Sequence, residues 1–242
     1  MPDDTPLNEF TATHHVMLFA WMSRAVIERA GPERGEPLMR KAVRRYREQR
    51  GRRMALRAAQ NGHALSMANF IAYGEWAAGE GEMAQEMVEK APHARVLVHR
   101  RPWHQAWEAN DLLPYGRPYC QEIDEALVRG FNPGLKLDVN STRTNDGIPC
   151  EFVFHDASLT LPRLLALAYK KAVKPGKQAV MPWSYHLGHL FKTASEVIIQ
   201  EPGETGREAV EAALAAFTAH YGEEAARIVP SYRSTDFDCL PE

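Results

Sequence analysis

The sequence predicts an α+β fold that is mostly helical, with a small central antiparallel β-sheet. Apolar residues recur at helical spacing near both ends of the chain, over residues 13–30 and 206–229. In the middle, residues 135–143 (LKLDVNSTR) and 150–155 (CEFVFH) read as two strands, and Asn145-Asp146-Gly147 between them is a turn signal. These observations predict helices at the two ends and a β-hairpin between them.

The first helix is the best defined, because His15, Leu18, Phe19, Met22 and Val26 fall on one face of it. A second helix is expected to end at Asn61-Gly62, and Ser66 is expected to cap a short third helix. A further strand is expected in the ARVLVH run. The complete set of expected helices is 13–30, 36–60, a short one after Ser66, 80–90, 103–113, 119–129, 158–171, 183–199 and 206–229; the strands are 94–99, 135–143 and 150–155.

The length of 242 residues fits one domain. We predict a single domain over 1–242, with a helical N-terminal part (1–91) and an α+β part (92–242) that contains the hairpin 135–155. Hydrophobic residues make up 45% of the chain and charged residues 25%, which is enough apolar material for an ordinary core.

Composition also indicates the cellular compartment and the classes of partner that we expect. The net charge of -2 gives no global attraction to nucleic acid or to anionic membranes. No apolar run reaches the roughly 18 residues that span a bilayer, and the start MPDDTPLNEF lacks the basic region of a secretory signal. Three cysteines without regular spacing favour a reducing compartment. We therefore expect a cytoplasmic protein with no membrane or nucleic-acid partner.

A basic segment complicates that expectation, because residues 40–57 contain nine Arg and Lys residues. A basic stripe can bind nucleic-acid phosphates. It can equally be a solvated helix whose charges pair with the acidic segment 75–89, and the near-zero net charge favours this second interpretation. Arg52 and Arg53 could also bind a carboxylate-bearing ligand, since a guanidinium matches a carboxylate in bidentate geometry.

Three segments carry a resemblance to a known family: Arg50–Trp76, Tyr115–Val139 (YGRPYCQEIDEALVRGFNPGLKLDV) and Gly147–Phe154 (GIPCEFVF). Their order and spacing resemble the L-2-aminothiazoline-4-carboxylic acid hydrolase family. In the second segment the family shows a cysteine, an aspartate four residues later and then a Gly-Phe-Asn-Pro turn. The resemblance implies hydrolysis of a non-peptide carbon–nitrogen bond that opens a five-membered ring.

Residue chemistry points to Cys120 as the reactive group. It lies at the start of the helix expected over 119–129, where unpaired N–H groups and the helix dipole favour a thiolate. A thiolate attacks amidine, imide or carbamoyl carbons. Asp124, one turn later, could orient a base or hold a ligand amino group. The alternative is that Cys120 is a small buried hydrophobe, as most unpaired cysteines are.

Three histidines are candidate bases for this chemistry. His104 lies between Trp103 and Trp107, His15 lies on the apolar face of the first helix, and His155 ends the hairpin beside Asp156, which could fix its tautomer. Aromatic walls suit a small planar ring. The aromatic residues expected to form them are Tyr73, Trp76, Trp103 and Trp107.

A metal site has weaker support. His186 and His189 could face together on one helix, and Cys120 with two histidines could bind zinc, but the sequence contains neither H-E-x-x-H nor C-x-x-C. We expect no metal and no cofactor. The sequence thus favours a ring-opening hydrolase with a small heterocyclic substrate. A non-catalytic small-molecule-binding or sensor domain is the alternative. The sequence leaves the oligomeric state open, and the apolar faces of several helices are compatible with a homo-oligomer.

Overall fold

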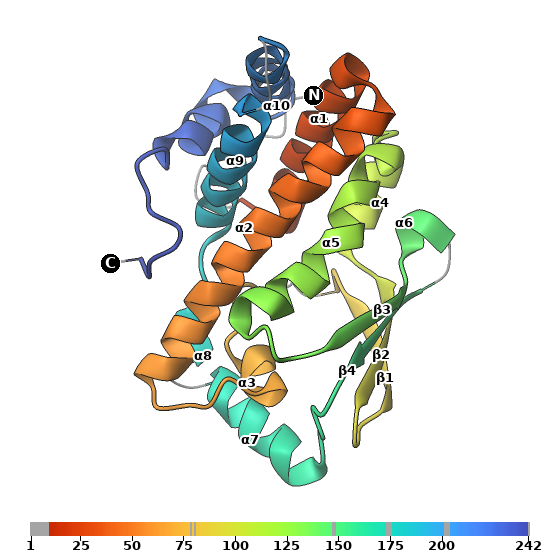
Figure 1. Ribbon diagram of the computed structural model, residues 1–242, viewed down its shortest axis with the longest axis vertical. Helices are drawn as coiled ribbons and strands as arrows, with labels where there is room; N and C mark the ends of the chain where they lie inside the picture. The colour runs from red at the N-terminus through yellow and green to blue at the C-terminus, as the bar shows by residue number, and fades with distance from the viewer. Residues whose placement is uncertain are drawn as a thin grey trace. The chain divides into compact units, whose positions relative to one another are not determined.

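Long helices and one four-stranded antiparallel sheet make up the computed structural model (Figure 1), which confirms the predicted mostly helical α+β class. The structure describes residues 10–77, 79, 81–146, 149–172, 176–200 and 204–241. The chain forms two compact units. Unit 1 comprises Met1–Tyr46, Pro102–Glu122 and Pro182–Thr235, and unit 2 comprises Arg47–Arg101, Ile123–Met181 and Asp236–Glu242.

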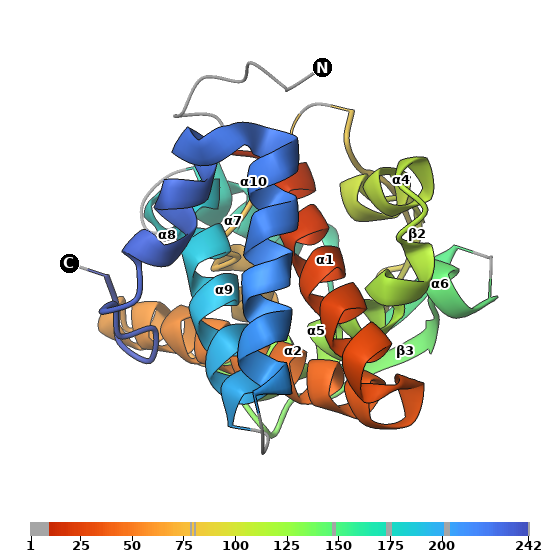
Figure 2. The same ribbon diagram turned by 90° about the horizontal axis from the view of Figure 1, so that it is seen from above.

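Unit 1 is helical. Figure 2 shows three of its helices, α1, α9 and α10, side by side. The five residues predicted to form the apolar face of α1, His15 among them, are all buried, and so is every residue from 14 to 23, so this part of α1 is buried on all sides. The helices that contribute to unit 1 are α1 (Ala12–Ala30), the first part of α2 (Pro32–Gln60), α4 (Pro102–Ala109), the first part of α5 (Leu113–Phe131), α9 (Trp183–Ile199) and α10 (Thr205–Ser231).

Unit 2 contains the sheet, whose strand order is β1-β2-β4-β3 with every neighbour antiparallel. The predicted pairing of the hairpin strands is confirmed, with Val139 opposite Phe152. Phe70, Phe131 and Phe152 belong to the core of this unit. Its strands are β1 (Ala84–Glu89), β2 (Ala94–Arg100), β3 (Leu137–Ser141) and β4 (Cys150–Phe154), and its short helices are α3 (Met67–Ala72), α6 (Arg143–Asp146), α7 (Leu161–Ala172) and α8 (Gly176–Ala179).

Two sequence-based expectations about elements are wrong. The acidic helix expected over 80–90 is strand β1, because its backbone pairs with β2, as in Gln85 opposite Val98. Pairing and packing in a sheet override the helix propensity of Glu, Gln, Met and Ala. The hairpin turn was expected at Asn145-Asp146-Gly147, but residues 143–146 form α6. Gly147 itself lies outside the described residues.

The start of α5 is the third difference. The helix expected over 119–129 begins earlier, at Leu113, so Pro114, Tyr115 and Gly116 belong to the first turn of α5. Proline is tolerated there because the first N–H groups of a helix have no partner within the helix. Gly116 is needed in this turn, since a Cβ atom on it would overlap with the indole of Trp107. Trp107 therefore packs directly on the backbone of α5.

Two glycines bring α2 and α5 into backbone contact in unit 2. A Cβ atom on Gly51 would overlap with the carbonyl oxygen of Leu127, and one on Gly130 would overlap with the carbonyl oxygen of Glu48. Only glycine allows so close an approach. Within the described residues, no helix is both long enough and apolar enough to cross a bilayer.

Candidate functional site

The thiol of Cys120 and the imidazole of His104 meet inside unit 1. Cys120 Sγ on α5 lies 3.6 Å from His104 Nε2 on α4, within hydrogen-bonding reach for sulfur. Both side chains are buried, with 5% and 3% of their surface exposed. The sequence predicted Cys120 as the nucleophile and, independently, His104 as one of three candidate bases. A thiol that can transfer its proton to a neighbouring imidazole is the arrangement that nucleophilic cysteine catalysis needs.

A second titratable pair lies beside the first. His15 Nε2 on α1 lies 3.0 Å from the hydroxyl of Tyr119, the residue that precedes Cys120. The ring of His15 also contacts the rings of Tyr46 and Trp183, at centroid distances of 5.6 and 5.8 Å. We call Cys120, His104, His15 and Tyr119 the Cys120 cluster. Tyr119 was not predicted, although its position next to the cysteine was a signal that could have found it.

More buried histidines contact the rings around the cluster. The ring of His189 lies 4.5 Å from that of Tyr46, and the ring of His186 lies 5.3 Å from that of Trp183. Both histidines lie on α9 and are completely buried. Across the part of the chain that the structure describes, no three His, Cys, Asp or Glu side chains are placed to hold a metal ion. Unit 1 thus gathers thiol, imidazole and phenol groups among aromatic rings.

The predicted reason for the reactivity of Cys120 is wrong. Because α5 begins at Leu113, Cys120 lies about two turns into the helix and not at its N-terminus. The unpaired N–H groups of the helix start are therefore too far away to favour the thiolate. The feature near Cys120 that can activate its sulfur is instead the contact with His104.

Trp103 and Trp107 lie around this pair on α4. Trp107 is completely buried, its Nε1 donates a hydrogen bond to the carbonyl oxygen of Val16 at 2.9 Å, and its ring lies 6.1 Å from that of His104. The ring of Trp103 lies 6.4 Å from that of Tyr119. The two tryptophans therefore pack around the Cys120 cluster, and Trp107 joins α4 to α1.

Asp124, the second candidate on α5, belongs to unit 2. Its Oδ2 accepts a hydrogen bond from Arg101 at 3.1 Å, and the guanidinium of Arg101 lies over the ring of Phe152 at 4.7 Å. Asp124 lines a pocket of 520 Å³ together with Arg50, Trp76 and Lys171. We call this the unit 2 pocket. It contains two residues that we predicted as site residues, Asp124 and Trp76.

The arginines of α2 that belong to unit 2 converge on one carboxylate. Arg53 donates to both oxygens of Glu75 at 3.1 and 2.8 Å, the Nε of Arg50 lies 3.6 Å from it, and Arg57 forms a further ion pair. Burial alone would raise the pKa of Glu75, but the positive charges of Arg53, Arg50 and Arg57 outweigh it, and the pKa is lowered. Glu75 and Arg53 are both completely buried.

The remaining predicted residues lie elsewhere in unit 2. Arg52 pairs with Asp238 at the surface, and the hydroxyl of Tyr73 lies 2.7 Å from His63 Nδ1. His155 Nε2 lies 2.7 Å from Asp138 Oδ2, so its partner is Asp138 and not the neighbouring Asp156. The hydrogen bond with His155 lowers the pKa of Asp138.

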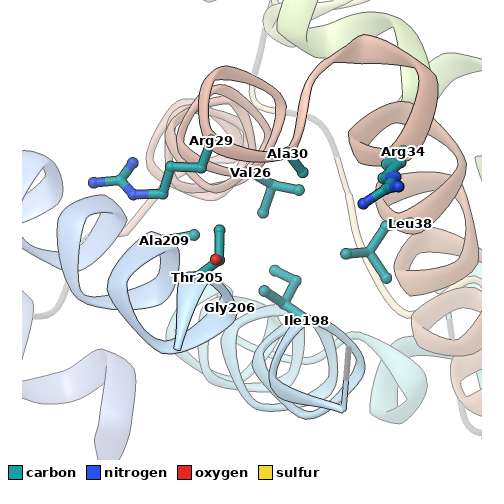
Figure 3. A pocket seen from close by; sticks show the side chains of 9 residues that line it. All are labelled: Val26, Arg29, Ala30, Arg34, Leu38, Ile198, Thr205, Gly206 and Ala209. Carbon is teal, nitrogen blue, oxygen red and sulfur yellow. The ribbon is translucent and has the colours of Figure 1, made fainter. Parts of the chain in front are cut away.

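Another pocket, of 240 Å³, lies in unit 1 among the ends of α1, α2, α9 and α10 (Figure 3). Figure 3 shows the hydroxyl of Thr205 and the side chains of Val26 and Ile198 around it, with the guanidinium of Arg29 directed away. Its lining includes no thiol, imidazole or carboxylate. It therefore lacks a nucleophile or a base, and the Cys120 cluster is the better candidate active site.

Comparison with known proteins identifies the family. The sequence model of the L-2-amino-thiazoline-4-carboxylic acid hydrolase family matches residues 11–154, a range that includes α1, α4, α5 and the whole sheet. No curated protein and no solved structure matches the chain. The family name indicates a hydrolase. Since the match covers more than half of the 242 residues, the chain belongs to the L-2-amino-thiazoline-4-carboxylic acid hydrolase family.

Proposed function

We propose that this protein hydrolyses a carbon–nitrogen bond in a small heterocyclic ring, with Cys120 as the nucleophile and His104 as the general base. The observation that carries the proposal is the distance of 3.6 Å between Cys120 Sγ and His104 Nε2 in the interior of unit 1. The family name supports a cyclic amidine such as 2-aminothiazoline-4-carboxylate as the substrate class. Cyclic amides and imides present the same electrophilic carbon.

The reaction follows from the chemistry of a thiol beside an imidazole. The Cys120 proton passes to His104, and the sulfur forms a bond to the ring carbon of the C=N or C=O group. The ring C–N bond then breaks, and the ring nitrogen takes the proton from His104. Water gives a proton to His104 and attacks the same carbon, which breaks the C–S bond; the proton returns to the thiolate. One water molecule is consumed in each cycle.

Three histidines were candidates for the base, and their surroundings favour His104. The Nε2 atom of His15 is directed at the Tyr119 hydroxyl, so His15 is better placed to position Tyr119 than to reach the sulfur. His155 follows β4 in unit 2, and its Nε2 is hydrogen-bonded to Asp138. We therefore assign proton transfer to His104 and leave His15 and Tyr119 as positioning residues of the cluster.

The test uses L-2-aminothiazoline-4-carboxylate as substrate. Cys120→Ser is expected to abolish turnover while the circular dichroism spectrum and the unfolding midpoint stay close to those of the parent protein, because the substitution is nearly isosteric. Cys239→Ser is the matched control, since Cys239 is an exposed thiol and is expected to be dispensable. Full turnover by Cys120→Ser would exclude the nucleophile role.

The burial of Cys120 favours a second candidate, a non-catalytic small-molecule-binding or sensor domain in which this thiol only packs. Alkylation by iodoacetamide separates the two. The first proposal expects modification of Cys120 to remove turnover, and a ring-type substrate to protect the thiol. A Cys120 thiol that resists alkylation in a protein without ring hydrolysis would support the second.

We also propose a cytoplasmic location, because the three cysteines form no disulfide. The partner that we propose is a small molecule, as the family name implies.

A further inference from the structure

The unit 2 pocket has the dimensions and walls of a small-molecule site. Its volume of 520 Å³ lies within the range of about 300–1,000 Å³ that is usual for ligand pockets. Most of its lining is apolar, with Phe70 from α3, Leu137 from β3 and Phe154 from β4. Trp76 adds an aromatic surface. A ligand in this pocket would place an apolar or planar body against these side chains.

Charged groups of both signs interrupt the apolar lining. Arg50 comes from α2, Asp124 from α5 and Lys171 from α7. Arg50 has only 2% of its surface exposed. Charges beside apolar walls are expensive to desolvate, so a pocket that carries three of them is suited to a ligand with complementary charges.

Two of these charges are held by neighbours behind them. The Nε of Arg50 lies 3.6 Å from the buried carboxylate of Glu75. Asp124 accepts a hydrogen bond from Arg101 at 3.1 Å, and Arg101 lies over Phe152. Such supporting contacts fix the direction of a binding group before the ligand arrives, which reduces the entropy lost on binding.

The third charge is the amine of Lys171, which is an exposed residue. The protein around this amine nevertheless removes part of its hydration, and this desolvation lowers its pKa. A carboxylate placed beside this amine would favour its charged form again. Lys171 would therefore gain a partner when an anionic group enters the pocket.

We propose that the unit 2 pocket binds a small zwitterion of the amino-acid type, whose carboxylate faces Arg50 and Lys171 and whose cationic nitrogen faces Asp124. The apolar body of the ligand contacts Trp76 and Phe70. Two sources share this chemistry, a free α-amino acid and a carboxylated cyclic amidine. The second source rests on the proposed function, and the first does not.

The experiment measures equilibrium binding by calorimetry to the full-length Cys120→Ser protein, so that a ring compound is not consumed. L-leucine and L-2-aminothiazoline-4-carboxylate are the two zwitterionic probes. L-leucinamide and 4-methylpentanoate have the apolar body of leucine but lack the carboxylate or the amine. At least one zwitterion is expected to bind ten times more tightly, or better, than either single-charge compound. Preference for leucine identifies a free amino acid as the ligand, and preference for the ring compound identifies the substrate class.

Variants locate the binding to the pocket. Lys171→Met and Asp124→Asn are each expected to weaken zwitterion binding by tenfold or more, and Lys171→Met keeps the test valid if Asp124→Asn, which deprives Arg101 of its carboxylate, fails to fold. Glu223→Gln, an exposed residue of α10, is the control and should bind like the parent. Absence of binding by both zwitterions, or unchanged affinity in Lys171→Met, would overturn the proposal. Turnover by the protein with its native Cys120 tests the proposed function separately.

Discussion

The Cys120 cluster of unit 1 and the pocket of unit 2 bury polar groups in two different ways. In the cluster, a thiol, two imidazoles and a phenol lie at hydrogen-bonding distance among aromatic rings. Around the pocket, carboxylates face guanidinium groups, as Glu75 faces Arg53 and Asp124 faces Arg101. The first set consists of neutral groups that can pass a proton along a hydrogen bond, whereas the second consists of paired opposite charges.

These two kinds of buried group are suited to different roles. A nucleophile and its base must change their protonation states during a reaction, which is easiest for groups such as thiol and imidazole. Buried ion pairs instead hold their charges in place. Removal of one partner lowers the stability of the fold, because the other charge is then buried without it. We therefore expect substitutions in the cluster to affect mainly turnover, and substitutions behind the pocket to affect mainly stability.

The largest effect on stability is expected for Glu75→Ala. It leaves Arg53 and Arg50 buried without this carboxylate, and breaking a buried ion pair in this way costs about 3–5 kcal/mol. The measurement is urea unfolding followed by circular dichroism. Glu86→Ala, which removes an exposed carboxylate of β1, is the control and is expected to change the free energy of unfolding by less than about 0.5 kcal/mol. Equal effects of the two variants would contradict the comparison.

Low pH should weaken the ion pairs of the same carboxylate, that of Glu75. Because the pKa of Glu75 is lower in the folded protein than the ordinary value of 4.5 for a glutamate, its ion pairs contribute stability that is complete above that value. The contribution is lost as the pH falls through the lower, folded-state pKa. Unfolding free energies measured from pH 7 downward should therefore decrease in the acid range. Glu75→Gln should be less stable at pH 7 and less sensitive to acid; a parallel pH dependence of the two proteins would argue against the assignment.

His104→Gln tests the prediction that substitutions in the Cys120 cluster affect mainly turnover. Loss of the general base is expected to lower kcat by about 10²–10⁴-fold on L-2-aminothiazoline-4-carboxylate, with a much smaller effect on unfolding than Glu75→Ala has. His99→Gln replaces an exposed histidine of β2 and should leave kcat unchanged. A variant at His104 that unfolds readily but retains its kcat would show that this histidine only packs.

A smaller loss is expected for Trp107→Phe. The substitution removes the Nε1 hydrogen bond to Val16 and leaves that buried carbonyl without this donor, which costs about 1–3 kcal/mol. Thermal unfolding measures the loss. If kcat falls by more than the lost stability explains, Trp107 also positions His104, whose ring it contacts; unchanged stability would show that the hydrogen bond contributes little.

The smallest effect on stability is expected at the N-cap of α3 in unit 2. Ser66 caps α3 by accepting a hydrogen bond from the N–H of Asn69. Ser66→Ala should cost about 1 kcal/mol of unfolding free energy. Ser66→Asp, which keeps an acceptor at the cap, should restore most of it. A stability loss in both variants would locate the effect in packing and not in the cap.

The helical spacing of apolar residues predicted α1 correctly as a helix, but it did not predict that residues 14–23 are buried on every side of it. Alternation also predicted β3 and β4. It failed for β1, whose burial pattern is almost entirely exposed and whose conformation is set by pairing with β2. The partners of individual side chains lay beyond sequence reasoning. The sequence offered three histidines to Cys120, and only the packing of α4 against its neighbours distinguishes His104 from the others.

The backbone contacts at Gly51 and Gly130 set the spacing of two helices that line the unit 2 pocket. Gly51 follows Arg50 on α2, and Gly130 lies on α5 with Asp124, so both helices that supply opposite charges to the pocket are drawn together at these glycines. A single added methyl group would act as a spacer between them. The distance between Arg50 and Asp124 therefore depends on two residues that do not line the pocket themselves.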